Sequence, residues 1–232
     1  MKLAIFDLDN TLLNGDSDFL WGEFICEQGL VDKHEYHEKN RHFHQQYMDG
    51  ELNITEFVEF VLAPMAGKTV EEMTAVHEKF MQAKIKYIMT RQARKLIAQH
   101  QDVGHTTLII TATNEFITRP IATAYGIDNL LATPAEVKNG KFTGNSPGTP
   151  CFQNGKIERL EAWLKENDYE PEETWFYSDS RNDIPLLEQV DNPIAVDPDD
   201  ALFDHAELLG WEVLWLHKPR PNEHDGEEDE LY

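Results

Sequence analysis

The sequence contains little cysteine and no long apolar run. Its 232 residues include two cysteines, Cys26 and Cys151, which lie far apart and form no C-x-x-C pair. This excludes a disulfide framework. Because Met1 and Lys2 lead straight into a strand pattern without a secretory leader, we expect a cytoplasmic protein. No apolar stretch approaches the length that spans a bilayer, so we expect no membrane partner.

Basic residues are scarce as well. The chain has 20 Lys and Arg against 43 Asp and Glu, and its formal net charge is -23. Nucleic acids and anionic membrane surfaces bind clustered Lys and Arg, which argues against either of them as the main partner. A small anionic substrate is not excluded, because local charge and a bound cation decide whether it binds.

Short apolar runs that suit buried strands alternate with helical stretches along the chain. We expect strands at residues 2–6, 106–111, 130–133, 174–178, 193–196 and 213–216. We also expect a helix at residues 88–100, a turn at residues 112–114 and a hairpin around Asn139-Gly140. Strands that alternate with helices imply right-handed parallel crossovers, so the sequence predicts an α/β fold with a doubly wound, Rossmann-like parallel sheet.

Helical periodicity runs through residues 16–86, directly after the first expected strand. We predict that this segment is a small helical cap inserted into an α/β core domain of residues 1–15 and 87–219. Residues 220–232 are acidic and lack periodicity, which predicts a disordered tail.

Polar side chains recur where the expected strands end and where one helix begins. They are Asp7, Asp9, Thr111, Lys156, Asp179 and Asp183. Each alone has a simple explanation as a turn former, a helix cap or a solvated residue. The carboxyl ends of parallel strands share one edge of the sheet, where ligands bind in such folds, so the recurrence favours a functional site. Adjacent carboxylates at that edge repel and need a proton, a cation or solvent between them.

These residues resemble the four motifs of the haloacid dehalogenase superfamily of phosphatases. The motifs are D-L-D-N-T at residues 7–11, the apolar strand that ends at Thr111, Lys156, and D-S-R-N-D at residues 179–183. They occur in the family's order over about residues 1–200. The helices directly after the first motif and the hairpin at residues 140–144 resemble the phosphoserine phosphatase branch.

The resemblance implies a phosphomonoesterase that works through an aspartyl-phosphate. Asp7 would be the nucleophile, a role for which a carboxylate is chemically competent. Asp9 would protonate the leaving oxygen and then activate water, which is general acid–base work for a carboxyl group with a raised pKa. Mg²⁺ would be bound by the side chains of Asp7 and Asp179 and by the backbone carbonyl of Asp9, because it prefers a few carboxylates together with water and phosphate oxygens.

The remaining motif residues would bind or support the phosphate. Thr111 through its hydroxyl, Lys156 through its ammonium group and backbone N–H groups near Ala112 would hold the phosphate oxygens. Asp183 would either bind the metal through water or orient Lys156, and Asn182 would support the same loop.

We expect the cap to recognise the rest of a small phosphorylated metabolite. Asp16 matches the position where phosphoserine phosphatases carry a Glu that faces the substrate amine, but residues 57–61 lack the Arg that those enzymes use for the substrate carboxylate. This favours an amine without a carboxylate, such as histidinol phosphate, phosphoethanolamine or phosphocholine. Arg41 could supply the missing cation, so phosphoserine stays an alternative.

Two other functions would use the same residues. One is a phosphotransferase or a nucleotidase, which differs in the acceptor or in the substrate. The other is a non-catalytic protein that binds a phosphorylated ligand, although such a protein has no use for an acid–base group at Asp9.

Two side-chain clusters in residues 16–86 have both a structural and a functional interpretation. We expect a solvated helix rather than a metal site for the histidines His34, His37, His42 and His44. We expect the core of the cap for the aromatic residues Trp21, Phe24, Phe57 and Phe60, although one of them could line the substrate pocket.

Overall fold

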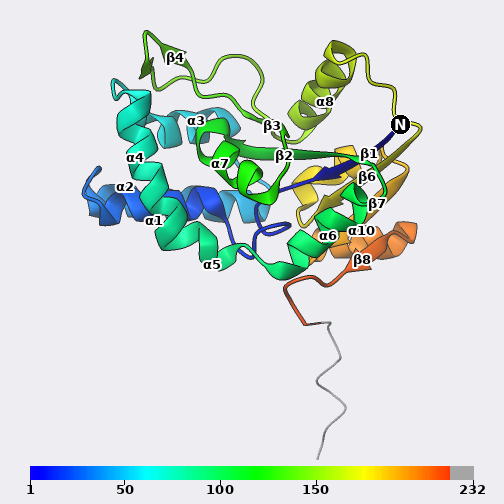
Figure 1. Cartoon of the computed structure of the whole chain (residues 1–232). Coiled ribbons are helices and arrows are strands. Elements are labelled where there is room, and N and C mark those ends of the chain that lie inside the picture. Colours follow the sequence, from blue (N-terminus) through cyan, green and yellow to red (C-terminus); the bar gives the residue numbers. More distant parts are fainter. Residues whose placement is uncertain (220–232) are drawn as a thin grey trace, which may run out of the picture.

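The computed structural model describes residues 1–219 and has an α/β fold. Six parallel strands form one sheet in the order β3-β2-β1-β6-β7-β8 (Figure 1). Their bounds are β1 Lys2–Phe6, β2 Thr106–Asn114, β3 Asn129–Thr133, β6 Glu173–Ser178, β7 Asn192–Val196 and β8 Glu212–Leu214. The strand order reverses next to β1, which confirms the predicted doubly wound sheet. The tail predicted at residues 220–232 lies outside the described residues.

Alternate side chains of β1 bury both faces of the sheet. Leu3 and Ile5 pack in one hydrophobic cluster, whereas Ala4 and Phe6 pack in another. The first face is covered by α8 (Asn154–Glu166), α9 (Ile184–Leu187) and α10 (Asp200–Leu209), and the second by α6 (Arg91–Gln101) and α7 (Glu115–Tyr125). Because β1 is fixed from both sides, the position of Asp7 directly after it is fixed too.

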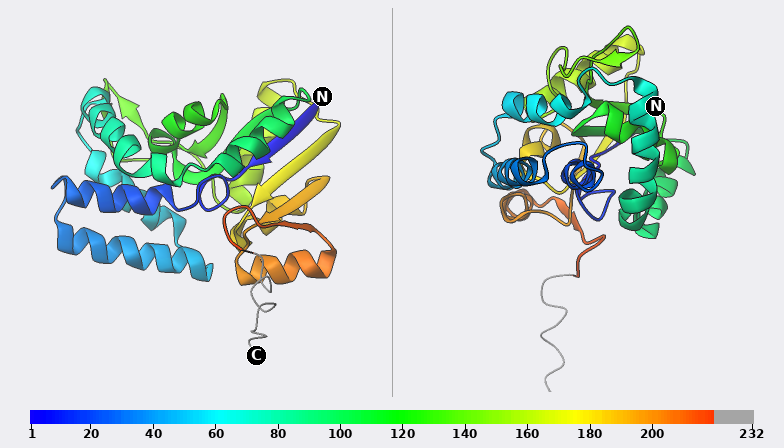
Figure 2. Two further views of the ribbon diagram at one scale, coloured as in Figure 1. Left: turned by 60° about the horizontal axis from the view of Figure 1, so that its bottom comes forward. Right: turned by 90° about the vertical axis from the view of Figure 1, so that its left-hand side faces the viewer.

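The segment between β1 and α6 is mostly helical. Its elements are α1 Ser17–Glu27, α2 Lys33–Asp49, α3 Ile54–Leu62, a 3-10 turn Ala63–Met65, α4 Val70–Phe80, a π-helical turn Met81–Ile85 and α5 Lys86–Ile88. The helices α1 and α2 lie side by side, beyond one end of the strands (Figure 2). That this segment is a separate cap domain stays a prediction.

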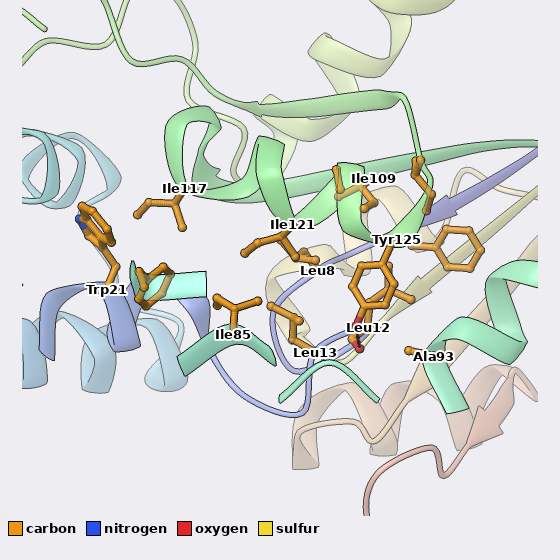
Figure 3. Packing of buried hydrophobic residues seen from close by; sticks show 14 of the residues in the cluster. Leu8, Leu12, Leu13, Trp21, Ile85, Ala93, Ile109, Ile117, Ile121 and Tyr125 are labelled. Atoms are coloured by element: carbon orange, nitrogen blue, oxygen red, sulfur yellow. Dashed lines mark hydrogen bonds between the residues drawn. The ribbon is translucent and has the colours of Figure 1, made fainter. Parts of the chain in front are cut away.

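One hydrophobic cluster connects these helices with the sheet. Figure 3 shows Trp21 of α1, Ile85, Ile117 of α7 and Ile109 of β2 in this cluster. The Trp21 ring also meets Phe80 and Phe116 edge-on, with centroids 5.2 and 5.8 Å away. This packing confirms Trp21 as a core residue and holds α1 against α7.

Three details of the secondary structure differ from the prediction. The helix expected at residues 88–100 begins only at Arg91, because Thr90 caps it by accepting a bond from the Ala93 amide at 3.1 Å. The turn expected at residues 112–114 is the end of β2, which continues past an irregularity in its pairing with β3. The helix α10 was not predicted. The expected hairpin is present as β4 Val137–Lys138 and β5 Lys141–Phe142.

No helix within residues 1–219 combines the length and the apolar character that crossing a membrane requires.

Candidate active site

The carboxylate that follows β1 belongs to a buried charge cluster. Lys156 Nζ donates a hydrogen bond to Asp7 Oδ1 and another to Asp183 Oδ2, each at 2.7 Å. Asp183 Oδ2 also accepts a bond from Ser178 Oγ at 2.7 Å. Asp7, Lys156 and Asp183 are all at most 4% exposed, so water screens their interactions little. Of the two roles predicted for Asp183, this geometry favours the orientation of Lys156.

Lys156 reaches the cluster from the first turn of α8. Gln153, just before the helix, has φ 48°, and a positive φ is uncommon for a residue other than glycine. Gly155 packs so closely that a Cβ there would overlap the carbonyl oxygen of Pro150. The absence of a side chain at this position therefore sets how far Lys156 extends into the site.

Gly155→Ala is expected to lower both stability and turnover. The added Cβ would displace α8 and carry Lys156 away from Asp7. Overpacking typically costs about 1–3 kcal/mol, and a misplacement of about 1 Å can reduce a rate roughly 100-fold. Urea denaturation and kcat measurements test this, with the exposed neighbour Asn154→Ala as the control that should change neither. An unchanged kcat in the Gly155 variant would mean that the position of α8 is not critical.

Burial and charge have opposite effects on the pKa values in this cluster. Burial raises the pKa of Asp7, Lys156 lowers it and Asp183 raises it, with a result of about 6. Burial alone would lower the pKa of Lys156, but the charges of Asp183 and Asp7 outweigh burial and raise it above its ordinary value. At neutral pH, Lys156 is therefore protonated and Asp7 is mostly ionised.

Asp9 lies at the N-terminus of α1. Its Oδ1 accepts a bond from the Ser17 amide at 2.6 Å, and its Oδ2 accepts a bond from Thr113 Oγ1 at 2.8 Å. Burial, followed by the charge of Asp16, raises the pKa of Asp9 to about 7, although the bonds from Ser17 oppose this. A carboxyl group that titrates near neutral pH is suited both to donate and to accept a proton.

Asp179 follows β6 and lies in the same acidic region. Its Oδ1 accepts a bond from Thr11 Oγ1 at 3.0 Å. Burial first, and then the charges of Asp7 and Asp183, raise the pKa of Asp179 well above its ordinary value. The site thus gathers several buried carboxylates, and such an arrangement favours the binding of a cation.

Strand β2 brings Thr111 and Ala112 to this region. Thr111 is buried, and its Oγ1 accepts a bond from the Thr113 amide at 3.2 Å. The carbonyl of Ala112 accepts a bond from Thr133 Oγ1 at 2.6 Å, which fixes this peptide group. Thr111 and Ala112 line a pocket together with Asp7. They lie where phosphate-binding groups would be needed, and their role stays a prediction.

Asn182 connects the loop after β6 with two other elements. Its Nδ2 donates to the Tyr47 carbonyl at 3.3 Å and to Ser180 Oγ at 3.1 Å, while its Oδ1 accepts from Gln153 Nε2 at 3.1 Å. These bonds join the end of α2 to the start of α8, and the supporting role of Asn182 in the reaction stays a prediction.

Asp16 caps α1, and both of its carboxylate oxygens have partners. Oδ1 accepts bonds from the amides of Asp18 and Phe19, each at 2.9 Å, and Oδ2 lies 3.2 Å from Nδ1 of His44. The hydrogen bond to Asp16 raises the pKa of His44, against the opposing effect of burial. His44 is therefore more readily protonated, and its charge then offsets that of Asp16.

A pocket extends from Asp7 and Asp9 towards α1, α2 and α3. About 540 Å³ of space lies between its lining residues when the open solvent at its mouth is counted, but the cavity itself is only about 40 Å³. Its wall is acidic and aromatic, and the residues beyond Asp7 and Asp9 include Asp16, Asp18, Phe19, Phe43, His44, Tyr47 and Phe57. None of the described residues that line this pocket is Lys or Arg. Of the four aromatic residues expected in the core of the cap, Phe57 is the one that lines this pocket.

Arg41 lies outside the candidate active-site pocket, and His44 is the histidine of α2 that lines this pocket. Arg41, which could have supplied a cation for a substrate carboxylate, lines a different surface pocket beside His34. His37 Nδ1 instead lies 2.7 Å from Glu23, and His42 is exposed. Within residues 1–219, no group of three or more His, Cys, Asp or Glu side chains has a metal-binding arrangement.

Several site residues were missed at the sequence level. The hydroxyls of Thr11, Thr113 and Ser178 bind the acidic side chains, and their signal was a hydroxyl residue close to each acid. Asp18 was missed because an acidic residue in the first turn of a helix is usually explained by the helix dipole.

Three comparisons with known proteins agree on the family of the chain. Residues 4–188 match the family of haloacid dehalogenase-like hydrolases. The chain is 44% identical over 217 residues to the histidinol-phosphatase of Neisseria meningitidis serogroup C (strain 8013), covering 92% of this chain and 98% of that protein. It resembles a solved protein of unknown function from Bordetella pertussis Tohama I, with 40% identity and a TM-score of 0.88. The match covers 93% of this chain and 98% of that one. Its fold also resembles a phosphoserine phosphatase solved as a phospho-aspartyl intermediate analogue, with 22% identity, a TM-score of 0.65 and 92% of each chain covered. As its four motifs predicted, the chain belongs to the haloacid dehalogenase-like hydrolase family.

Proposed function

We propose that the chain is a Mg²⁺-dependent phosphomonoester hydrolase that acts on histidinol phosphate through an aspartyl-phosphate. The observation that carries the proposal is the pocket that joins Asp7 and Asp9 to an acidic and aromatic wall. Family membership and the relative named histidinol-phosphatase make the chain a phosphatase. The wall of the pocket adds information about the alcohol part of the substrate.

Asp7 is the nucleophile in this proposal. Lys156 binds its Oδ1, which leaves Oδ2 to attack the phosphorus atom. The new bond joins Oδ2 to phosphorus, while the bond between phosphorus and the ester oxygen breaks. Lys156 keeps Asp7 ionised and oriented, because the ammonium group is itself held by Asp183.

Asp9 moves the protons. In the first step its protonated carboxyl group gives a proton to the departing alcohol oxygen. In the second step, the ionised carboxylate takes a proton from the water molecule that attacks phosphorus. The bond between phosphorus and Asp7 Oδ2 then breaks, which releases phosphate and restores the Asp7 carboxylate. The bonds from the Ser17 amide and the Thr113 hydroxyl hold the carboxyl group in place for both transfers.

Mg²⁺ fits the donors present at this site. Asp7 offers a buried carboxylate and Asp179 a partly buried one, and in this proposal the carbonyl of Asp9 would add a third oxygen. Among the described residues, no three His, Cys, Asp or Glu side chains are arranged to bind a metal ion. Mg²⁺ does not need three, because it commonly binds one or two carboxylates and completes its coordination shell with water and phosphate oxygens. When bound, the ion neutralises charge between the acidic side chains and the phosphate.

Thr111, the backbone near Ala112 and Lys156 bind the phosphate oxygens in this proposal. The Thr111 hydroxyl can donate to phosphate because its own oxygen accepts from the Thr113 amide. Lys156 adds a positive charge where negative charge gathers during phosphoryl transfer.

The pocket wall favours an aromatic amino-alcohol phosphate over phosphoserine. Asp16 gives the wall negative charge, which suits an ammonium group, and Phe19 and Phe57 suit a flat ring. No Lys or Arg lines the pocket within the described residues, so a substrate carboxylate would lack a partner.

A phosphatase screen with Mg²⁺ tests the proposal. We expect kcat/KM for histidinol phosphate to exceed that for phosphoserine by roughly 100-fold or more, because a buried carboxylate without a partner is costly. The comparison should include phosphoethanolamine, phosphocholine and nucleotides, and an alcohol acceptor to detect phosphotransfer. Preference for phosphoserine or a nucleotide would overturn the substrate assignment, and binding without turnover of any ester would indicate a non-catalytic protein.

A further inference from the structure

Asp18, the second residue of α1, is a buried carboxylate with an unsatisfied oxygen. It is 6% exposed and lines the candidate active-site pocket. Its Oδ1 has no hydrogen-bond partner among the described residues. Burial first, and then the charges of Asp16 and Asp9, raise the pKa of Asp18 well above its ordinary value. The negative charges of Asp16 and Asp9 therefore oppose the ionisation of Asp18, and neither neutralises its charge.

The fold gives little reason for a carboxylate at this position. An acidic residue in the first turn of an exposed helix contributes about 0.3–1 kcal/mol through the helix dipole. A buried polar group without a partner costs about 1–3 kcal/mol, and a charged one costs more. Asp16 already caps the helix through the amides of Asp18 and Phe19. Asp18 is therefore expected to have a partner that is not part of the chain.

Asp16 is less suited than Asp18 to bind a cation from a ligand. Both of its oxygens are engaged, one by two amides of α1 and the other by His44. A protonated His44 also offsets the charge of Asp16. Of these two carboxylates in the wall, Asp18 has the free acceptor.

We propose that Asp18 binds the ammonium group of the substrate directly and so determines the preference for amino-alcohol phosphates. This inference rests on the proposed function and names the residue that reads the amine. An ammonium group has three hydrogen-bond donors, and it carries the positive charge that would compensate an ionised Asp18. Phe19 and Phe57 line the same pocket and can face the cation or an adjoining flat ring. Asp16 then acts indirectly, as the cap of α1 and the partner of His44.

The test compares Asp18→Asn with the wild-type full chain on two substrates in the presence of Mg²⁺. For histidinol phosphate we expect kcat/KM to fall roughly 30- to 100-fold, because the ammonium group loses its charged partner. For p-nitrophenyl phosphate, which has no amine, we expect a loss below about 5-fold. The melting temperature should not fall, because the substitution removes a buried and unpaired carboxylate.

Asp200→Asn is the matched control, since Asp200 is also acidic and lies in the first turn of an exposed helix, α10. It should alter neither substrate's kinetics. Equal losses on both substrates in Asp18→Asn, or a variant that does not fold, would overturn the inference in favour of a structural role. If the wild type itself shows no preference for the amine-bearing ester, the proposed substrate class fails. A wild-type preference that persists in Asp18→Asn means that this inference alone fails.

Discussion

Asp7→Asn is expected to abolish hydrolysis of every phosphomonoester, with a fall in kcat of at least roughly 10⁴-fold, the scale seen when a covalent nucleophile is removed. An amide oxygen is a poor nucleophile towards phosphorus and cannot form the acyl phosphate. The loss should not depend on the leaving group, because every ester must transfer its phosphoryl group to residue 7 whichever alcohol departs.

The variant is expected to fold normally. The pKa of Asp7 is raised to about 6, mainly by burial, so its ionisation at neutral pH costs the folded state stability relative to the unfolded chain, and the neutral amide avoids this cost. Lys156 loses one partner but keeps its bond to Asp183 Oδ2. Thermal unfolding should therefore separate loss of chemistry from loss of structure.

Acid quenching during turnover, followed by mass spectrometry of peptides, provides the direct measurement. We expect phosphate on the peptide that contains residue 7 in the wild type and none in Asp7→Asn. Asp204→Asn, an exposed acidic residue of α10, serves as the control and should be labelled like the wild type. Turnover in Asp7→Asn close to that of the wild type would rule out this nucleophile.

The sheet and the position of the candidate catalytic residue Asp7 could be predicted, because local sequence patterns determine them. A buried strand places the residue after it at the sheet edge, so Asp7 followed from the apolar run before it. Thr111 was expected to end its strand in the same way, but it lies within β2, which continues to Asn114. Lys156 was predicted at the start of a helix, and the structure places its Nζ 2.7 Å from Asp7. The distance itself could not be predicted, because it depends on the close packing of Gly155.

The wall of the substrate pocket was less predictable, because it is assembled from separate helices. Phe19, Phe43 and Phe57 come from α1, α2 and α3 and meet only after these helices pack. Each of these aromatic residues also fits a helix core, and sequence periodicity does not distinguish a core face from a pocket face. The engagement of Asp16 by His44 likewise depends on how α1 packs against α2.

Lys156→Met is expected to have the largest effect on stability of any substitution in the site. Removing one partner from a buried ion pair typically costs about 3–5 kcal/mol, because the remaining charge is left uncompensated. Here two carboxylates, Asp7 and Asp183, would face each other without the ammonium group that now binds both. Methionine has a similar length, so a cavity contributes little to the loss.

The loss should depend on pH in a defined direction. The folded-state pKa of Asp7 is already raised to about 6 from 3.8, mainly by burial, and Lys156 lowers it. Without Lys156 this pKa rises further, and a carboxyl group with a raised pKa in the folded state contributes stability that is lost as pH rises through that value. The difference in unfolding free energy between wild type and variant should therefore be larger at about pH 8 than at about pH 5.

Urea denaturation at both pH values measures this difference. Lys165→Met, an exposed position on the same helix, is the control and should match the wild type at both. Equal stability of Lys156→Met and wild type at the higher pH would mean that Lys156 does not neutralise the buried carboxylates. A loss that is the same at both pH values would point to packing instead. A difference in unfolding free energy that grows from about pH 5 to about pH 8 would show that the positive charge of Lys156, which the proposed reaction requires, also stabilises the fold.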